Sequence, residues 1–255
     1  MRLTVLVDNY SLIDYYYLAE PALSFYIEDN DKKILFDTGY SDVIIQNANK
    51  MGIDLNEINT IVLSHGHNDH TGGLVYLKSL KQNIDLYCLN GVDEHKEHDG
   101  KDISSPITLD KLPSNFIIHS SMEQQKISDH LTLLGKIERT IQPLRKLGDD
   151  PLYDDSALIY QNNDLISIIT GCSHSGICNI IKQAMNTTSI NKIDKIVGGF
   201  HLLKNMDITN EVCDYFKTQD ITEVYPCHCT DLMSKIALSK VVNVKEIGVG
   251  TIIDF

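Results

Sequence analysis

The sequence predicts an α+β fold, specifically an αββα sandwich in which two mixed β-sheets are flanked by helices. Both halves of the 255-residue chain alternate short apolar runs, which are typical of strands, with longer segments of helical periodicity. In addition, histidine-rich polar clusters directly follow several of the predicted strands. Side chains placed in this way would gather at sheet edges, where they could form a functional site.

The first part of the chain is rich in predicted strands. Apolar runs with the length of strands occupy residues 3–7, 23–28, 32–39, 60–64 and 83–90. Residues 41–52 have the apolar spacing of a short helix that ends at Gly52. Residues 71–82 predict a second helix with leucines along one face.

The second regular part begins near residue 156. Predicted strands occupy residues 157–160, 165–170, 195–200 and 222–226, with a last one within 246–255. Predicted helices occupy residues 175–186, 209–219 and 232–242. We predict a single domain over residues 1–255, from which residues 91–150 form a long surface excursion because they mix charged runs with prolines.

Composition excludes several classes of function. The formal net charge of -13 gives no general support for binding to phosphate backbones, so a nucleic-acid partner is not expected. The N-terminal MRLTVLVDNY does not resemble a secretory signal, and no apolar run approaches the roughly 20 residues of a membrane helix. We therefore expect a cytoplasmic protein without a membrane partner, whose six scattered cysteines are reduced. Its oligomeric state is open.

The most informative motif is a cluster of three imidazoles and one carboxylate within six residues, directly after a predicted strand. His65, His67, Asp69 and His70 make up this cluster. Imidazole nitrogen and carboxylate oxygen bind zinc, iron or manganese and can leave coordination positions open to water. A turn could direct His65 and His67 toward one metal, and Asp69 and His70 toward a second.

Three further segments each place a histidine after a predicted strand. They are TGCSHSG with His174, GGFHL with His201 and PCHCT with His228. Each could bring its imidazole to the sheet edge that carries the first cluster. Several strand ends together would supply what a centre with two metals needs.

The His-x-His-x-Asp-His motif, preceded by the Phe36-Asp37-Thr38-Gly39 turn, resembles the metallo-β-lactamase superfamily. The later segments, with the runs DDSAL from Asp154 and EPALSF from Glu20, are similar to the metal-dependent hydrolases of β-lactamase superfamily II. That group includes the methanogen dihydropterin-ribofuranosylaminobenzene-phosphate synthase. The resemblance covers nearly the whole chain and is weakest over residues 91–150.

The resemblance implies the metal ligands position by position. They are His65, His67, Asp69, His70, His174 and His228. The expected cofactor is a divalent metal, one or two zinc ions, with iron or manganese as alternatives. His201 resembles an extra histidine near the metals in ribonuclease-Z-like relatives, so we assign it a catalytic role in proton transfer or in holding an anionic substrate group. We expect Asp69 to orient the nucleophile as well as to bind metal.

The chain also departs from the superfamily pattern. Gly171-Cys172 stands where a bridging aspartate is usual, so Cys172 or His174 would do that work, and we favour His174. An intermediate histidine is hard to place, and His95, His98, His119 and His130 fit surface loops better than ligands. An extended strand would turn Cys227 and Cys229 away from His228, which predicts packed thiols rather than ligands.

These features predict a metal-dependent hydrolase, in which a metal-activated water attacks an ester, phosphoester or related bond of a small molecule, phosphorylated or not. One alternative is a pterin-phosphate condensing synthase of the same family, because both reactions need the same activation of the electrophile. The other is a non-catalytic metal-dependent binding or sensing protein. The nearly complete ligand set favours an enzyme over a binding or sensing protein.

Overall fold

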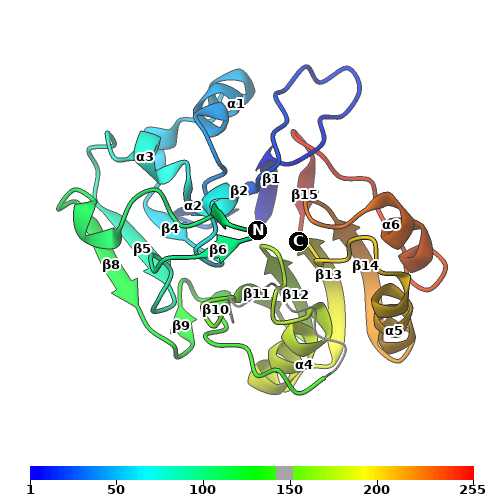
Figure 1. Ribbon diagram of the computed structural model, residues 1–255. Helices are drawn as coiled ribbons and strands as arrows, with labels where there is room; N and C mark the ends of the chain where they lie inside the picture. The colour runs from blue at the N-terminus through cyan, green and yellow to red at the C-terminus, as the bar shows by residue number, and fades with distance from the viewer. Residues whose placement is uncertain (142–151) are drawn as a thin grey trace. The chain divides into compact units, whose positions relative to one another are not determined.

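The structure is a computed structural model that describes residues 1–141 and 152–255. The chain divides into two compact units, whose elements are labelled in Figure 1. Unit 1 comprises Met1–Met122 and Gly248–Phe255, and unit 2 comprises the described residues from Glu123 to Ile247. The single domain over residues 1–255 stays a prediction. Within the described residues, no helix combines the length and apolar character needed to cross a bilayer.

Unit 1 is built on a mixed sheet of seven strands in the order β15-β1-β2-β3-β4-β5-β8. In this order, the three pairs from β15 to β3 are antiparallel, and the three pairs from β3 to β8 are parallel. The two chain ends meet in this sheet, because β1 pairs with β15. The strands span, in chain order, Arg2–Val7, Ser24–Asp29, Lys32–Phe36, Thr60–Val62, Ile84–Cys88, Phe116–Ser120 and Ile252–Asp254.

Short helices complete unit 1. They are α1 (Val43–Met51), α2 (Asn68–Thr71) and α3 (Leu74–Leu77), with 3-10 helices at Leu55–Glu57 and Leu109–Lys111. A two-stranded ribbon, β6 (Glu97–His98) and β7 (Lys101–Asp102), lies apart from the main sheet. α1 ends at Gly52 in the left-handed conformation, as the sequence predicts. Its Ile44 packs with Leu35, Ile61 and Leu86 of the sheet in one apolar core.

Unit 2 is built on a mixed sheet of six strands in the order β14-β13-β12-β11-β10-β9. The pairs from β14 to β12 are parallel, and the pairs from β12 to β9 are antiparallel. The strands span, from β9 to β14, Gln125–Lys126, Leu131–Leu133, Ala157–Asn162, Leu165–Thr170, Lys192–Gly198 and Asp220–Pro226. Because the parallel strands point the same way, the segments that follow β12, β13 and β14 meet at one edge of this sheet.

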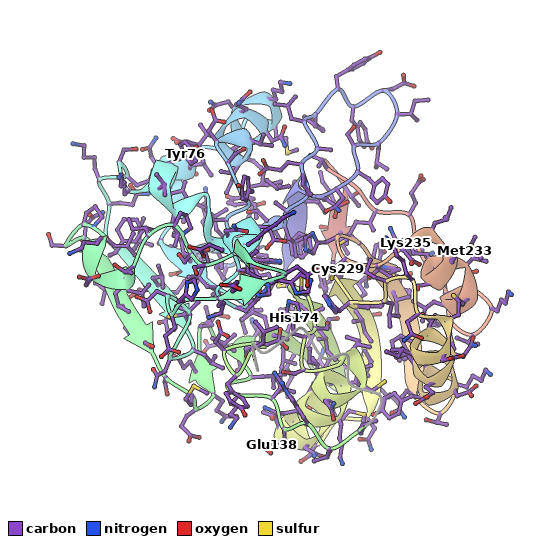
Figure 2. All side chains as sticks on the ribbon, viewed as in Figure 1. Tyr76, Glu138, His174, Cys229, Met233 and Lys235 are labelled. Atoms are coloured by element: carbon purple, nitrogen blue, oxygen red, sulfur yellow. The ribbon has the colours of Figure 1, made fainter. Side chains whose placement is uncertain are left out.

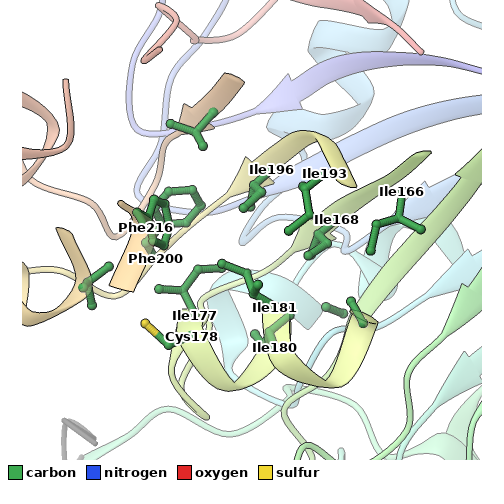
Figure 3. Close-up of a cluster of buried hydrophobic side chains, with 14 of the residues drawn as sticks. Ile166, Ile168, Ile177, Cys178, Ile180, Ile181, Ile193, Ile196, Phe200 and Phe216 are labelled. Atoms are coloured by element: carbon green, nitrogen blue, oxygen red, sulfur yellow. The ribbon is translucent and has the colours of Figure 1, made fainter. Parts of the chain in front are cut away.

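The helices of unit 2 connect its parallel strands. They are α4 (Ile177–Thr188), α5 (Met206–Phe216) and α6 (Leu232–Leu238). α4 packs on β11 and β12, and α5 contacts both α4 and α6. Figure 3 shows the core that holds them, in which Ile180 and Ile181 of α4 meet Ile168 and Ile196 of the sheet. Burial of these large apolar side chains stabilises the packing of α4 on the sheet.

Two local predictions differ from the structure. The helix predicted over residues 71–82 is divided into α2 and α3, because Gly72 and Gly73 lie against the backbone of the 38–40 turn. A Cβ at Gly73 would come within 2.0 Å of the Thr38 carbonyl oxygen. The predicted surface excursion over residues 91–150 contributes β8, β9 and β10 to the two sheets within its described part.

Candidate metal-binding clusters

The first cluster lies in unit 1, directly after β4. The chain leaves the sheet at Leu63, places His65 and His67 in an irregular turn, and enters α2 with Asp69 and His70 on it. The three imidazoles are buried, and their rings lie against one another, with 4.2 Å between the ring centres of His65 and His70. The structure thus brings together the four residues that the sequence predicts as one cluster.

Asp37, at the end of the neighbouring strand β3, organises this cluster. Its carboxylate accepts hydrogen bonds from the Ser64 backbone N–H and from the Ser64 hydroxyl, both at 2.7 Å. His70 Nδ1 lies 2.7 Å from the same carboxylate. Ser64 Oγ in turn lies 2.9 Å from His65 Nδ1. Since Asp37 accepts and the Ser64 proton is already donated, both Nδ1 atoms are the protonated ones.

This network leaves Nε2 of His65 and of His70 as the nitrogens that could bind a metal. His65 Nε2 lies 3.1 Å from His67 Nδ1, and His70 Nε2 lies 3.7 Å from Asp69 Oδ2. Two nitrogens held at about 2.0–2.1 Å by one tetrahedral zinc ion would be about 3.3 Å apart. Both pairs have spacings near that value, so the residues present fit a metal centre.

Asp37 and Ser64 were not assigned a role from the sequence. Asp37 belongs to the Phe36-Asp37-Thr38-Gly39 turn that carries the family resemblance, but neither its spacing nor its type reveals its partners. The parallel pairing of β3 with β4 places Asp37 beside Ser64, and this pairing is visible only in the fold. Asp37 has a φ of 58°, which is strained for a residue with a side chain and is typical of functional turns.

The second cluster lies in unit 2, where β12, β13 and β14 end. Cys172 and His174 follow β12, His201 follows β13, and His228 and Cys229 follow β14. His201 and His228 take left-handed backbone conformations, with φ of 52° and 49°. Each costs about 1–3 kcal/mol. The strand ends therefore turn sharply at the positions of the candidate ligands. Figure 2 labels His174 and Cys229 among these side chains.

The side chains of the second cluster touch one another. His228 Nε2 lies 3.2 Å from Cys172 Sγ, and Cys229 Sγ donates to the Cys172 carbonyl oxygen at 3.5 Å. The rings of His174 and His201 have centres 4.4 Å apart. Gly199 permits this approach, because a Cβ there would lie 2.5 Å from Cys229 Sγ.

A protein-family model described as the metallo-beta-lactamase superfamily matches residues 18–182, which is more than half of the chain. The chain belongs to the metallo-β-lactamase superfamily. An uncharacterized protein of Methanocaldococcus jannaschii is 31% identical and covers 98% of both chains. The superfamily binds divalent metals, and both clusters consist of residues that could do so.

Two further relatives of this superfamily agree with the resemblance predicted from the motifs. The 7,8-dihydropterin-6-methyl-4-(β-D-ribofuranosyl)-aminobenzene-5'-phosphate synthase of Methanocaldococcus jannaschii is 26% identical, covering 90% of this chain and 87% of that protein. A crystal structure of a metal-dependent hydrolase of the β-lactamase superfamily is 28% identical with a TM-score of 0.85, covering 100% of this chain and 99% of that one. The family resemblance is thereby confirmed.

The fold class is confirmed as well. The structure is α+β, with two mixed sheets and flanking helices, as the metallo-β-lactamase fold requires. Zinc-bound PqqB from Methylobacterium extorquens has the same fold at a TM-score of 0.63, covering 100% of both chains with 10% identity.

Cys229 differs from its sequence interpretation. We predicted that Cys227 and Cys229 both point away from His228 along an extended strand, but β14 ends at Pro226 and His228 has a left-handed φ. The turn buries Cys227 and brings Cys229 beside Cys172 and His201. Burial raises the pKa of the Cys229 thiol, but the polar groups of Cys172 and His201, with the charge of His228, outweigh it and hold this pKa well below its usual range.

The remaining histidines lie elsewhere. His95 and His98 are exposed near β6, and His119 Nε2 lies 2.8 Å from Asp85 Oδ1 with its ring stacked on Tyr87. The His130 ring lies against Tyr160. Within the described residues, none of these four belongs to a group of ligands that could hold a metal.

A pocket in unit 2 lies beside the second cluster. His174 and His201 line it together with residues of α4, α5 and the segments after β12 and β13, most of which are apolar, among them Phe200 and Val212. Both ring nitrogens of His201 are buried, and neither has a hydrogen-bond partner among the described residues. An imidazole in this state is available to a ligand.

Proposed function

We propose that this protein is a metal-dependent hydrolase that cleaves an ester, phosphoester or related bond of a small molecule. Its membership of the metallo-β-lactamase superfamily supports this proposal. So does its similarity over the full chain to a metal-dependent hydrolase of that superfamily. The observation that carries the proposal is the chain of hydrogen bonds from Asp37 through Ser64 to His65, together with the contact between Asp37 and His70.

We propose a metal centre that holds one or two divalent ions, zinc in the first place and iron or manganese as alternatives. Its ligands would be the six residues assigned from the sequence, namely His65, His67, Asp69, His70, His174 and His228. A bound divalent metal lowers the pKa of water to about 7 and polarises the carbonyl or phosphoryl oxygen under attack.

The protein's own groups would orient and protonate the reactants. The Asp69 side chain is partly exposed, at 28%, so its second oxygen can accept a proton from an attacking water and fix its direction. His201 borders the pocket with both nitrogens available, and we propose that it protonates the leaving group or holds an anionic part of the substrate. The buried walls around both clusters keep bulk water away and strengthen these interactions.

Metal removal tests the proposal. We expect a chelator to abolish hydrolysis in a panel of phosphoesters, lactones, thioesters and pterin phosphates, and we expect zinc, manganese or iron to restore it. His67→Gln should lose this activity, whereas His98→Gln, at an exposed position of β6, should keep it. Hydrolysis that survives metal removal unchanged would contradict the proposal.

A second candidate is a condensing synthase that acts on a pterin phosphate. It is favoured by the 26% identity with a dihydropterin-ribofuranosylaminobenzene-phosphate synthase over 90% of this chain. The same metal centre could activate a phosphate or diphosphate as leaving group. Mass analysis of the products from a pterin phosphate, with and without an arylamine acceptor, separates the two. An adduct in which the arylamine nitrogen has displaced the phosphate from the pterin carbon supports the synthase, and an alcohol product with free phosphate supports the hydrolase.

A further inference from the structure

Two thiols and an imidazole converge at the strand ends of unit 2. Cys172, His201 and Cys229 each offer one ligand atom, and these three atoms all lie within 4.8 Å of one another. They come from three different strand ends, after β12, β13 and β14, so their meeting is a property of the fold and not of a local sequence motif.

We propose that Cys172, His201 and Cys229 form a sulfur-rich ligand set that binds a zinc-class cation. This inference rests on the proposed function, because it names ligands for an ion in the same centre. It adds the Cys172 and Cys229 thiolates and the His201 imidazole to the six-residue ligand set, and His201 would then bind the ion instead of transferring a proton.

The spacing suits such an ion. Zinc binds sulfur at about 2.3 Å and nitrogen at about 2.0–2.1 Å, so tetrahedral geometry separates two such ligand atoms by about 3.5–3.8 Å. From a spread of at most 4.8 Å, the three atoms would need to approach by about 1 Å. Side-chain rotation could supply this movement without a change in the strands.

The backbone is shaped for this approach. Gly199 has no side chain, and a Cβ there would lie 2.5 Å from Cys229 Sγ and 2.6 Å from the Gly171 carbonyl oxygen. His201 has a left-handed φ of 52°, so the chain turns sharply at this residue. Its two ring nitrogens are buried without a hydrogen-bond partner among the described residues. A buried polar group in this state destabilises the fold, and a bound cation would offset that cost.

Packing alone explains other cysteines of this unit but not these two. Cys178 and Cys213 lie in the apolar core among isoleucine, valine and phenylalanine side chains. Cys172 instead contacts His228, and Cys229 donates to a backbone carbonyl. Thiolates prefer zinc and other soft or borderline metals over magnesium, calcium and manganese. The set would therefore favour zinc, iron or cobalt at the ion that it holds.

Cobalt(II) substitution of the full-length protein tests the inference. Thiolate-bound cobalt absorbs strongly in the near ultraviolet through sulfur-to-metal charge transfer, whereas cobalt bound by nitrogen and oxygen alone does not. We expect this band in the wild type. Cys172→Ser and Cys229→Ser should each remove about half of it, and the double variant all of it. Cys213→Ala, a buried cysteine outside the set, should keep it.

The wild-type spectrum makes the test independent of any folding defect in the variants. Cobalt bound in stoichiometric amount without the sulfur band would overturn this inference while leaving the proposed function intact. Failure to bind cobalt or zinc at all would instead defeat the proposed function. His201→Gln decides the third ligand: loss of metal supports its place in the set, and full metal content with reduced kcat overturns it.

Discussion

At the scale of single residues, the histidine cluster depends on a carboxylate that does not belong to it. Asp37 contacts both Ser64 and His70, so it sets which nitrogen of each imidazole faces a metal. Unit 1 contains a second pair of a histidine with an aspartate, in which His119 Nε2 lies 2.8 Å from Asp85 Oδ1; this pair is partly exposed and lies outside any ligand group of the described residues. Asp85 therefore offers a control for the effect of Asp37 on metal binding.

Replacing Asp37 should weaken metal binding without removing a ligand. Asp37→Asn keeps the side-chain shape but disturbs the proton positions on His65 and His70, and we expect a loss of about 10–100-fold in metal affinity. Competition with a chromophoric chelator measures this. Asp85→Asn should leave the affinity as in the wild type, and an equal loss in both variants would contradict the role of Asp37.

Asp155 should make the stability of the metal-free protein depend on pH. One of its oxygens accepts from the Ser175 backbone N–H at 2.7 Å, and burial raises its pKa from 3.8 to about 6. The folded state therefore binds the Asp155 proton more tightly than the unfolded state does. The contribution of this proton to the free energy of unfolding is complete below pH 3.8 and is lost as the pH rises through 6. The loss amounts to about 3 kcal/mol, at about 1.36 kcal/mol for each pKa unit.

Urea unfolding from pH 4 to pH 7.5 measures this effect. Asp155→Asn, which stays neutral, should flatten the fall and be more stable than the wild type at pH 7.5. Asp164→Asn, an exposed position in the same unit, serves as the control and should follow the wild-type profile. A wild-type fall that persists in Asp155→Asn would show that another group is responsible.

The candidate ligands could be predicted from the sequence, because their residue types and spacing indicate metal binding. The sequence could not reveal Asp37, whose partners come from strand pairing, or Cys229. The prediction for Cys229 assumed an extended strand beyond Pro226, but the left-handed φ of His228 reverses the chain there. Residues that follow a strand are therefore placed by the turn and not by strand alternation.

At the scale of elements, the parallel strands deliver the functional side chains. β3 and β4 end at Asp37 and the histidine cluster of unit 1, and β12, β13 and β14 end at the thiols and imidazoles of unit 2. Most of these strands could be predicted, since their apolar runs are long. β8, β9 and β10 could not, because short and polar strands are defined by their partners in the sheet.

Close approach of these strand ends depends on glycine. Gly199→Ala would place a Cβ 2.5 Å from Cys229 Sγ and 2.6 Å from the Gly171 carbonyl oxygen, so we expect destabilisation by about 1–3 kcal/mol. Gly100→Ala, where nothing lies within 4 Å, should cost only the left-handed penalty of about 1–2 kcal/mol. Urea unfolding measures both. Metal affinity should fall in Gly199→Ala alone, and an unchanged affinity there would contradict the link between this turn and the ligands.

At the scale of the whole molecule, composition and motif order were sufficient to predict the family and the fold class. The net charge of -13 also limits the partners we propose to small molecules, phosphorylated or not, because a polyanion would be repelled. What the sequence leaves open is the substrate, since residues 91–150, where the resemblance is weakest, contain few motifs with a known chemistry.

The central claim, which we propose, is that the histidines assigned from the sequence hold one or two divalent ions. Elemental analysis of protein purified without added metal tests it most directly, on the wild type and on one ligand variant from each unit, His65→Gln and His228→Gln. We predict one or two ions per wild-type chain and a loss of metal in both variants. Full metal content in His228→Gln, with loss only in His65→Gln, would contradict the claim.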